Sequence, residues 1–228
     1  MANWHTRIAA FDLETTGLDL SEARIVTACV VELGTDGTPI SNPREWLVNP
    51  GVSIPEVATS VHGITNEVAQ REGMPSIRAI AEIVSALSDL QQRKVSVAIF
   101  NAPYDLTILR AECARYSLPA LDARLIVDPL VLDRKFVPFR RGKRTLTVLA
   151  DAYGVPLENA HDSTADAIAA GQLAQLQIAT HVRPETTAED LQEMQSIWSD
   201  EQTASLEQFI RKSNPAFAAS YGWPLKAS

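Results

Sequence analysis

The stretch Phe11-Asp12-Leu13-Glu14-Thr15-Thr16-Gly17-Leu18 follows directly on the first apolar run of the chain, which begins at Ile8. Side chains alternate between the two faces of a strand, so Asp12 and Glu14 leave one face together while Leu13 points into the core. Two carboxylates this close repel each other unless a proton or a cation offsets their charge, and a divalent metal ion is the usual solution. An exposed acidic strand end has the same pattern, so the pattern alone leaves both interpretations open.

Two further strands are expected beyond this stretch. The segments Arg24 to Leu33 and Glu45 to Val48 have strand character, and the turn signal Gly34-Thr-Asp-Gly37 separates them. Helical spacing of apolar residues recurs from Pro55 to Ala69 and from Ser76 to Leu90, which predicts two surface helices. The N-terminal part therefore predicts a three-stranded meander followed by helices.

The second half of the chain alternates between strand and helix signals, which predicts an α/β fold with a mixed sheet of about five strands flanked by α-helices. The expected elements are strands at Val95–Phe100 and Leu125–Val127, and helices at Pro103–Tyr116, Leu146–Tyr153 and Ser163–Thr180, the last with Asp162 as N-cap.

A helical extension is expected after Pro184. The sequence Thr186-Thr-Ala-Glu189 is similar to a capping box, and apolar residues at helical spacing follow from Leu191 to Trp198. We therefore expect a main domain at residues 1–180 and an extension at 181–228. The closing Tyr221-Gly-Trp-Pro-Leu225 is too apolar for a free tail, and it should fold back on the domain or meet a partner.

Charge is unevenly distributed along the chain. The 228 residues carry a formal net charge of -8, which by itself argues against a nucleic-acid partner. The segment Arg134 to Arg144, however, holds six basic side chains, two aromatic ones and no acidic one. It is either a merely solvated basic loop or a phosphate-binding loop, and in the second case the candidate contacts are Arg140, Arg141, Lys143 and Arg144.

The cysteines and the N-terminus exclude some classes of protein. Cys29 and Cys113 are far apart in apolar surroundings, which predicts two buried thiols and neither a zinc site nor a disulfide framework. The polar start of the chain, with two acids ending the first apolar run, predicts neither a signal peptide nor a membrane span. We expect a cytoplasmic protein.

Three more residues that could carry chemistry follow predicted strands or open helices. Asp105 should lie in the first turn of the helix after the strand at Val95–Phe100, and Asp166 lies one turn into the helix that opens after His161. Sites in α/β folds form at the carboxyl ends of strands, which makes these acids candidate ligands. An ordinary acid that favours a helix dipole would occupy the same places.

A cluster of several carboxylates with a single imidazole suits Mg²⁺ or Mn²⁺, whereas zinc would recruit more His or Cys. Two such ions suit phosphoryl chemistry, because one activates water and the other stabilises the leaving 3′ oxygen. His161, with an unperturbed pKa of about 6.5, is suited to accept a proton from the attacking water.

Four motifs occur in order: Phe-Asp-Leu-Glu-Thr-Thr-Gly-Leu at 11–18, Val-His-Gly-Ile-Thr at 61–65, Asn-Ala-Pro-Tyr-Asp at 101–105 and His-Asp-Ser-Thr-Ala-Asp-Ala at 161–167. The set resembles the DEDDh (DnaQ-like) 3′-5′ exonucleases, the superfamily of the proofreading epsilon subunit of bacterial DNA polymerase III. The resemblance covers roughly Arg7 to Ala179. It implies an RNase H-like fold.

The resemblance also implies roles for individual residues. The metal-linked carboxylates would be Asp12, Glu14, Asp105 and Asp166, with His161 as the general base. Thr15 and Thr16 would contact the terminal nucleotide, Leu18 would wedge against its base, and His62 would lie beside the bound strand. For His62 a role in capping its loop is the alternative, and Tyr104 either stacks on a base or packs in the core. Asn101 matches the family only by its place in the motif, and Phe100 stands where many relatives carry His.

The function expected from these residues is metal-dependent hydrolysis of single-stranded or frayed DNA from the 3′ end, in proofreading or repair. RNA is the rival substrate, because no residue visibly excludes a 2′-hydroxyl. A non-catalytic recruitment module is the second class, against which the complete set of five core residues argues. A DNA polymerase or a sliding clamp is a candidate partner. The segment Gln202 to Leu206 is only faintly similar to a clamp-binding peptide, and we expect it to pack on the core.

Overall fold

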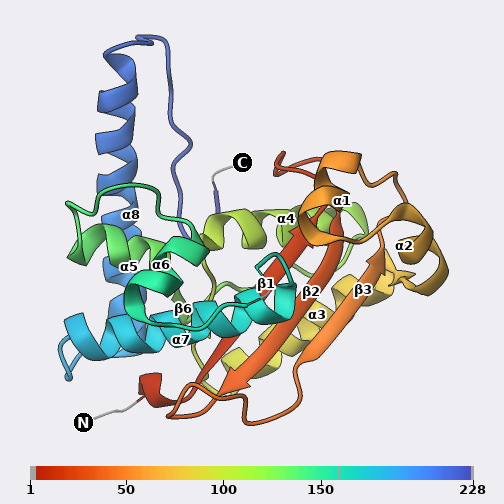
Figure 1. Ribbon diagram of the computed structural model, residues 1–228, viewed down its shortest axis with the longest axis horizontal. Coiled ribbons are helices and arrows are strands. Elements are labelled where there is room, and N and C mark those ends of the chain that lie inside the picture. Colours follow the sequence, from red (N-terminus) through yellow and green to blue (C-terminus); the bar gives the residue numbers. More distant parts are fainter. Residues whose placement is uncertain (1–3, 159, 227–228) are drawn as a thin grey trace.

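One mixed sheet forms the centre of the computed structural model, which describes residues 4–158 and 160–226 (Figure 1). The strand order is β4-β3-β2-β1-β5-β6. Strands β1, β2 and β3 form an antiparallel meander, β5 and β6 run parallel to β1, and β4 runs parallel to β3. The strand bounds are β1 Ile8–Thr15, β2 Ile25–Leu33, β3 Arg44–Asn49, β4 Met74–Pro75, β5 Val97–Ala98 and β6 Ile126–Val127.

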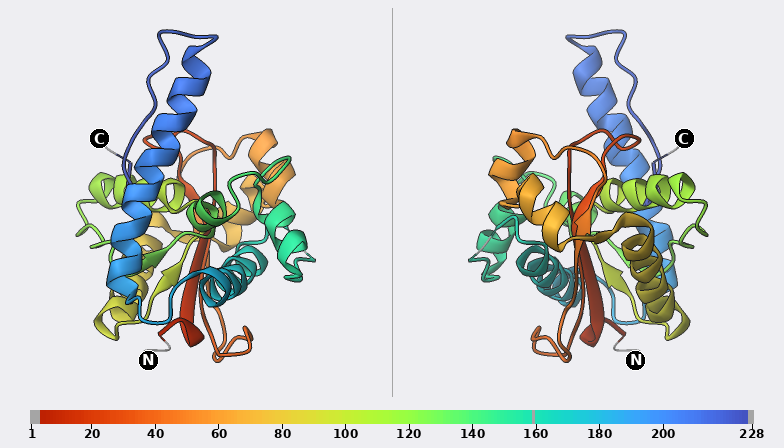
Figure 2. Two further views of the ribbon diagram at one scale, coloured as in Figure 1. Left: turned by 90° about the vertical axis from the view of Figure 1, so that its left-hand side faces the viewer. Right: turned by 90° about the vertical axis from the view of Figure 1, so that its right-hand side faces the viewer.

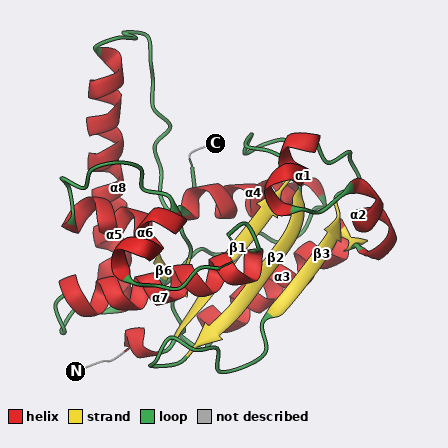
Figure 3. Cartoon of the chain, viewed as in Figure 1, coloured by secondary structure: helices red, strands yellow, loops and turns green. Residues whose placement is uncertain are grey.

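Helices cover both faces of this sheet. Figure 2 views the sheet edge-on, with α6 and α7 on one face and α3 and α4 on the other. The helix bounds are α1 Glu56–His62, α2 Asn66–Glu72, α3 Ser76–Gln92, α4 Ala102–Arg115, α5 Pro129–Phe136, α6 Leu146–Tyr153, α7 Ser163–His181 and α8 Ala188–Arg211, after a short 3-10 helix at Trp4–Thr6. Figure 3 shows the same layers coloured by secondary structure, so the predicted α/β class is confirmed.

Helix α7 packs closely on β1 and β2 because Gly171 has no side chain. A Cβ atom at this position would lie 2.5 Å from Leu33 Cδ1 and 3.1 Å from Ala10 Cβ, closer than packed atoms approach. The many alanines of α7 have small side chains, so the rest of the helix also approaches the sheet closely. The N-terminus of α7 is thereby held close to the sheet.

The structure corrects several expected boundaries. The helix predicted over Pro55 to Ala69 is two helices, because Gly63 ends α1 in the left-handed conformation at φ 76° and Thr65 caps the start of α2. Strand β1 continues past its apolar run, since Asp12 and Glu14 pair in register with β2. Helix α5 and the short β4 were not predicted.

The C-terminal extension covers the edge of the sheet. Helix α8 begins with a capping box made by Thr187 and Asp190, one residue later than predicted. Gln192 and Gln195 on this helix hydrogen-bond through their side-chain amides to the backbone of β6, an edge strand that would otherwise expose unpaired groups. The tail then folds back, as expected, and buries Trp223.

The structure also bears on the expectations for the two cysteines and for membrane spans. Cys29 and Cys113 are free and buried, as predicted. Within residues 4–158 and 160–226, no helix is both long enough and apolar enough to cross a membrane.

Candidate active site

The acidic pair on β1 is joined by a third carboxylate from α4. Asp12 and Glu14 lie on one face of β1, two residues apart. Asp105 lies in the first turn of α4 and is almost fully buried, and its Oδ1 accepts a hydrogen bond of 3.1 Å from the backbone NH of Leu13. Three carboxylates from two elements are thus brought to one place.

Asp128 holds the start of α4 in place. This role was not predicted from the sequence. Asn101 has a φ of 63° and its own side chain makes no capping bond. Asp128 instead accepts bonds of 3.0 Å from the NH groups of Asn101 and Ala102, and a third bond from Trp223 Nε1. The pair Asp128-Pro129, an N-cap residue followed by proline, is a sequence signal for a helix start that could have revealed this residue.

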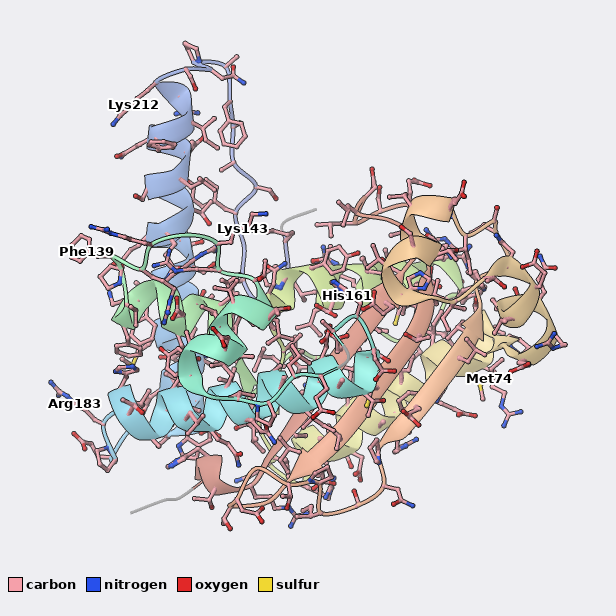
Figure 4. All side chains as sticks on the ribbon, viewed as in Figure 1. Met74, Phe139, Lys143, His161, Arg183 and Lys212 are labelled. Carbon is pink, nitrogen blue, oxygen red and sulfur yellow. The ribbon has the colours of Figure 1, made fainter. Side chains whose placement is uncertain are left out.

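The fourth carboxylate and the histidine come from the start of α7. Asp166 Oδ2 accepts a bond of 3.1 Å from the backbone NH of His161, which holds a left-handed φ of 71°. Single ligand atoms from Glu14, His161 and Asp166 all lie within 4.8 Å of one another. Figure 4 shows the exposed His161 just before α7. The predicted core residues therefore converge from β1, α4 and α7.

Burial and mutual repulsion raise the pKa of every carboxyl group in this cluster. Burial raises the pKa of Asp12 most, and the neighbouring charges of Asp105 and Asp166 raise it further. The pKa of Glu14 rises to about 7, first through burial and then through Asp166 and Asp162. Burial also raises the pKa of Asp105 and of Asp166. Such a cluster favours a bound cation, which offsets the repulsion.

One buried oxygen in the cluster has no partner. Asp166 Oδ1 is inaccessible to solvent and makes no hydrogen bond within the described part of the chain. A buried carboxylate oxygen without a partner is costly, and a divalent cation with oxygen ligands removes that cost. The residues present thus fit a metal site.

Residues predicted to contact the terminal nucleotide surround the end of β1. The Thr15 and Tyr104 hydroxyl groups lie 2.6 Å apart, and both reach the carbonyl of Gly17. Thr16 Oγ1 accepts a bond from the NH of Arg24, which closes the loop between them. Leu18 on this loop is 86% exposed, as a side chain that packs on a base would be.

Two aromatic positions have structural partners. His62 Nδ1 accepts a bond of 3.1 Å from the NH of Ile64, so the side chain does cap its loop. Burial lowers the pKa of His62, which favours the neutral imidazole. Phe100 packs against a small core cluster that includes Leu149.

The four candidate phosphate contacts of the basic segment form two pairs with different surroundings. Arg140 and Arg144 both form ion pairs with Asp133, whose side chain is fully buried, so their first role is structural. Arg141 and Lys143 are exposed. The prediction of phosphate contacts therefore rests on Arg141 and Lys143.

Comparison with known sequences accounts for this arrangement. Residues 9–174 match the sequence profile of the RNase T exonucleases, which is most of the chain. The chain belongs to the RNase T exonuclease family. The predicted relationship to DnaQ-like 3′-5′ exonucleases is thereby confirmed.

Two relatives differ in the share of their own length that this chain covers. The epsilon subunit of DNA polymerase III from Treponema pallidum is 28% identical over 179 residues, 78% of this chain and 80% of that subunit. The PolC-type DNA polymerase III of Streptococcus suis is 28% identical over 164 residues, 72% of this chain. The chain spans only 10% of that polymerase.

Solved structures of exonuclease I share the fold. Escherichia coli exonuclease I in complex with a dA16 oligonucleotide superposes with a TM-score of 0.67 at 20% identity, covering 77% of this chain and 41% of that chain. This likeness confirms the predicted RNase H-like fold. Membership of the family also implies divalent metal ions, in agreement with the acidic cluster.

Proposed function

We propose that this chain removes nucleotides from the 3′ end of single-stranded or frayed DNA and releases nucleoside 5′-monophosphates, in proofreading or repair. One observation carries the proposal: acidic side chains from β1, α4 and α7 converge with His161 around the unpartnered Oδ1 of Asp166. DNA is supported over RNA because the relatives are named as a DNA polymerase III and as a DNA polymerase III subunit, and because exonuclease I is in complex with dA16.

The ions would be two Mg²⁺ or Mn²⁺, held by the carboxylates of Asp12, Glu14, Asp105 and Asp166. Bound there, they would supply Lewis-acid activation of water and stabilisation of the charge that develops on the leaving 3′ oxygen. The oxygen-rich ligand set favours these hard cations over zinc.

His161 acts as the general base in this proposal. Its imidazole accepts a proton from the attacking water as the new bond to phosphorus forms. The bond between phosphorus and the 3′ oxygen of the preceding nucleotide breaks, and that oxygen takes up a proton. Because His161 is exposed, the imidazolium can return its proton to solvent after each cycle. The backbone bond to Asp166 holds the residue beside the carboxylates.

The loop after β1 orients the terminal nucleotide in this mechanism. Leu18, which is 86% exposed, packs on the terminal base, while Thr15 and Thr16 fix the shape of the loop. The Tyr104 hydroxyl, already bonded to Gly17, keeps that loop against α4. These contacts position the last phosphodiester bond near His161.

Partners and location stay predictions. A DNA polymerase is the proposed partner because the T. pallidum relative is named as a polymerase subunit. A clamp-binding role for Gln202 is not supported, since its side chain donates a bond of 3.1 Å to the carbonyl of Val131. The cytoplasmic location expected from the sequence also stays a prediction.

A substrate panel tests the proposed activity. The protein is incubated with 5′-labelled single-stranded DNA, RNA and mismatched duplex, with Mg²⁺, Mn²⁺ or EDTA. Stepwise shortening of DNA that stops in EDTA is expected. Faster shortening of RNA would reassign the substrate, and no shortening of any of them would contradict the exonuclease reaction.

The role of His161 has a matched control in His181, the last residue of α7. His161→Ala should reduce turnover at least ~100-fold while Mn²⁺ affinity, measured by calorimetry, is retained. His181→Ala, at the far end of α7 where the ring stacks on Phe136, should leave turnover close to wild type. Loss of Mn²⁺ binding in His161→Ala would instead make His161 a ligand.

A further inference from the structure

The loop of residues 137–145, which joins α5 to α6, is anchored by a buried carboxylate. Asp133 on α5 is fully buried and accepts bonds of 2.6 Å from Arg140 and 2.8 Å from Arg144. Arg144 also donates a bond of 2.6 Å to the carbonyl of Val137. Two guanidinium groups on one buried carboxylate hold the loop at Arg140 and at Arg144, because each donates charge-assisted hydrogen bonds to Asp133.

A second contact ties the loop to α6. The Arg140 guanidinium lies over the ring of Tyr153, 5.4 Å from its centroid, and the Tyr153 hydroxyl donates a bond of 3.4 Å to Asp133. A stacked arginine that also forms an ion pair loses more freedom than a solvated one. The loop therefore has a defined conformation, although it contains no helix or strand.

Three side chains of this loop are directed into solvent. Phe139 is 94% exposed, the most exposed large apolar side chain among the described residues. Arg141 and Lys143 are exposed, and Gly142, at φ +88°, turns the chain between them. Within residues 4–158 and 160–226, neither of these two cations has an acidic partner. An aromatic ring and two free cations are thus displayed together.

The loop lies on the face of the molecule that holds the candidate active site. Figure 2 shows that the loop, α6 and α1 project from the sheet face covered by α7. Figure 4 shows Lys143 at the end of the loop nearer to His161 and Phe139 directed outward at the other end. A strand that runs from the carboxylates across this face toward α6 meets Lys143 before it meets Phe139.

We propose that the 137–145 loop is a binding element for single-stranded nucleic acid, in which Phe139 stacks on a base and Arg141 and Lys143 bind phosphates. An exposed aromatic ring beside cations is how proteins hold single strands without reading their sequence. The net charge of -8 makes such a local cationic element necessary for a polyanionic ligand. This element would hold the strand that the active site degrades, so its link to the active site rests on the proposed function.

Direct binding tests the loop separately from catalysis. Fluorescence anisotropy with labelled dT16 is measured in EDTA, which stops hydrolysis, from 50 to 300 mM salt. Phe139→Ala should raise Kd ~10-fold. In the Arg141→Ser/Lys143→Ser double variant, the slope of log K against log salt should fall by ~1.4, because each lost phosphate contact on a single strand contributes ~0.7.

The matched control removes two cations at the opposite end of the sheet. It combines Lys94→Asn, where φ is 56° and asparagine tolerates the left-handed backbone, with Arg124→Ser. This variant has the same net charge as the double variant, so it separates a local contact from a general charge effect. Equal salt slopes in the two variants, or an unchanged Kd for Phe139→Ala, would overturn the proposal.

Strand length separates failure of this proposal from failure of the proposed function. If the chain is an exonuclease, the loop variants should slow degradation of dT16 through a higher KM, while kcat for dT2, whose single phosphodiester bond is the one cleaved, stays within twofold of wild type. If wild type degrades dT16 and the variants do so equally well, the loop proposal fails alone. If wild type degrades nothing but binds dT16 through the loop, the exonuclease proposal fails alone.

Discussion

The backbone NH of Leu13, the residue between Asp12 and Glu14, donates a hydrogen bond of 3.1 Å to Asp105 Oδ1. This bond joins the central strand to the first turn of α4, so the acid from α4 is fixed relative to the pair on β1. The bond needs an acceptor oxygen at position 105, which a neutral amide also provides. The charge of Asp105 and its role in holding the fold can therefore be separated by substitution.

Asp105→Asn should stabilise the metal-free protein and weaken metal binding. The amide keeps the bond to Leu13, and it removes a charge that burial disfavours, as the raised pKa of Asp105 shows. In EDTA the thermal midpoint should rise. Mn²⁺ affinity by calorimetry should fall ~10-fold or more. Asp151→Asn, an exposed acid on α6, is the control. Unchanged Mn²⁺ affinity would remove Asp105 from the ligand set.

The sequence predicted this cluster because its members lie at the ends of recognisable elements. Asp12 and Glu14 end an apolar strand, and Asp105 and Asp166 lie in first helical turns. Their convergence depends on strand order, which single motifs do not encode. The ordered set of motifs supplied that information through its resemblance to one family.

The contacts that escaped prediction are long-range in sequence. Asp128 caps α4 from 26 residues away, and Asp133 lies in a helix that was not predicted. Segment 134–144 looked uniformly basic because side-chain partners are set by tertiary packing and not by composition. Gly171 likewise shows its role only against Leu33. Sequence patterns specify the faces and ends of elements, whereas the pairing of side chains across elements is set by the tertiary structure.

The stability of the metal-free protein should fall as pH rises from about 4.5 to about 7, in part through Glu14. The pKa of Glu14 is raised from 4.5 to about 7 in the folded protein, chiefly by burial. Between these values the unfolded chain has lost this proton while the folded chain keeps it, so rising pH favours unfolding. Below 4.5 both states are protonated and the effect vanishes.

Urea unfolding in EDTA at several pH values measures this effect, with Glu14→Gln as the comparison. The variant has no proton to lose, so its advantage over wild type should grow from pH 4.5 to 7 and then level off. With added Mn²⁺ at pH 8, wild type should be more stable than Glu14→Gln, because the metal stabilises only the charged site. A difference that stays constant with pH would contradict the raised pKa.

Glu112→Ala should destabilise the protein by about 3–5 kcal/mol, because it leaves a buried arginine unpaired. Glu112 is 1% exposed, and its Oε1 accepts bonds of 2.5 Å from both Arg24 and Arg115. Arg115 also bonds to the carbonyl of Ser21, so the network holds the loop that carries Leu18. Urea unfolding measures the loss, and a KM for dT16 raised more than kcat is lowered would show that the loop has moved.

Asp89→Ala is the matched control for Glu112. Asp89 pairs with Arg93 at the exposed end of α3, where a surface salt bridge contributes less than about 1 kcal/mol. If the two variants lose equal stability, the Arg24 network does not act as a buried ion pair. If Glu112→Ala is unstable but retains the wild-type KM, the network stabilises the fold without positioning the loop.

The proposed division into an exonuclease domain at residues 1–180 and an extension at 181–228 does not make the extension dispensable. Leu191 and Trp223 are buried in the main core. Trp223 also donates a bond of 3.2 Å to Asp128, the residue that caps α4. The extension thereby supports the helix on which Asp105 lies.

Gln195→Met tests this support at its most buried contact. The Gln195 amide is fully buried; it accepts a bond of 2.7 Å from the NH of Asp128 and donates one of 3.0 Å to the carbonyl of Ile126. Methionine fills the same space but leaves both backbone groups unsatisfied, so a loss of about 2–4 kcal/mol in urea unfolding is expected. Gln208→Met, at an exposed position of α8, should cost less than about 0.5 kcal/mol. Equal losses would mean that α8 covers β6 without completing its hydrogen bonds.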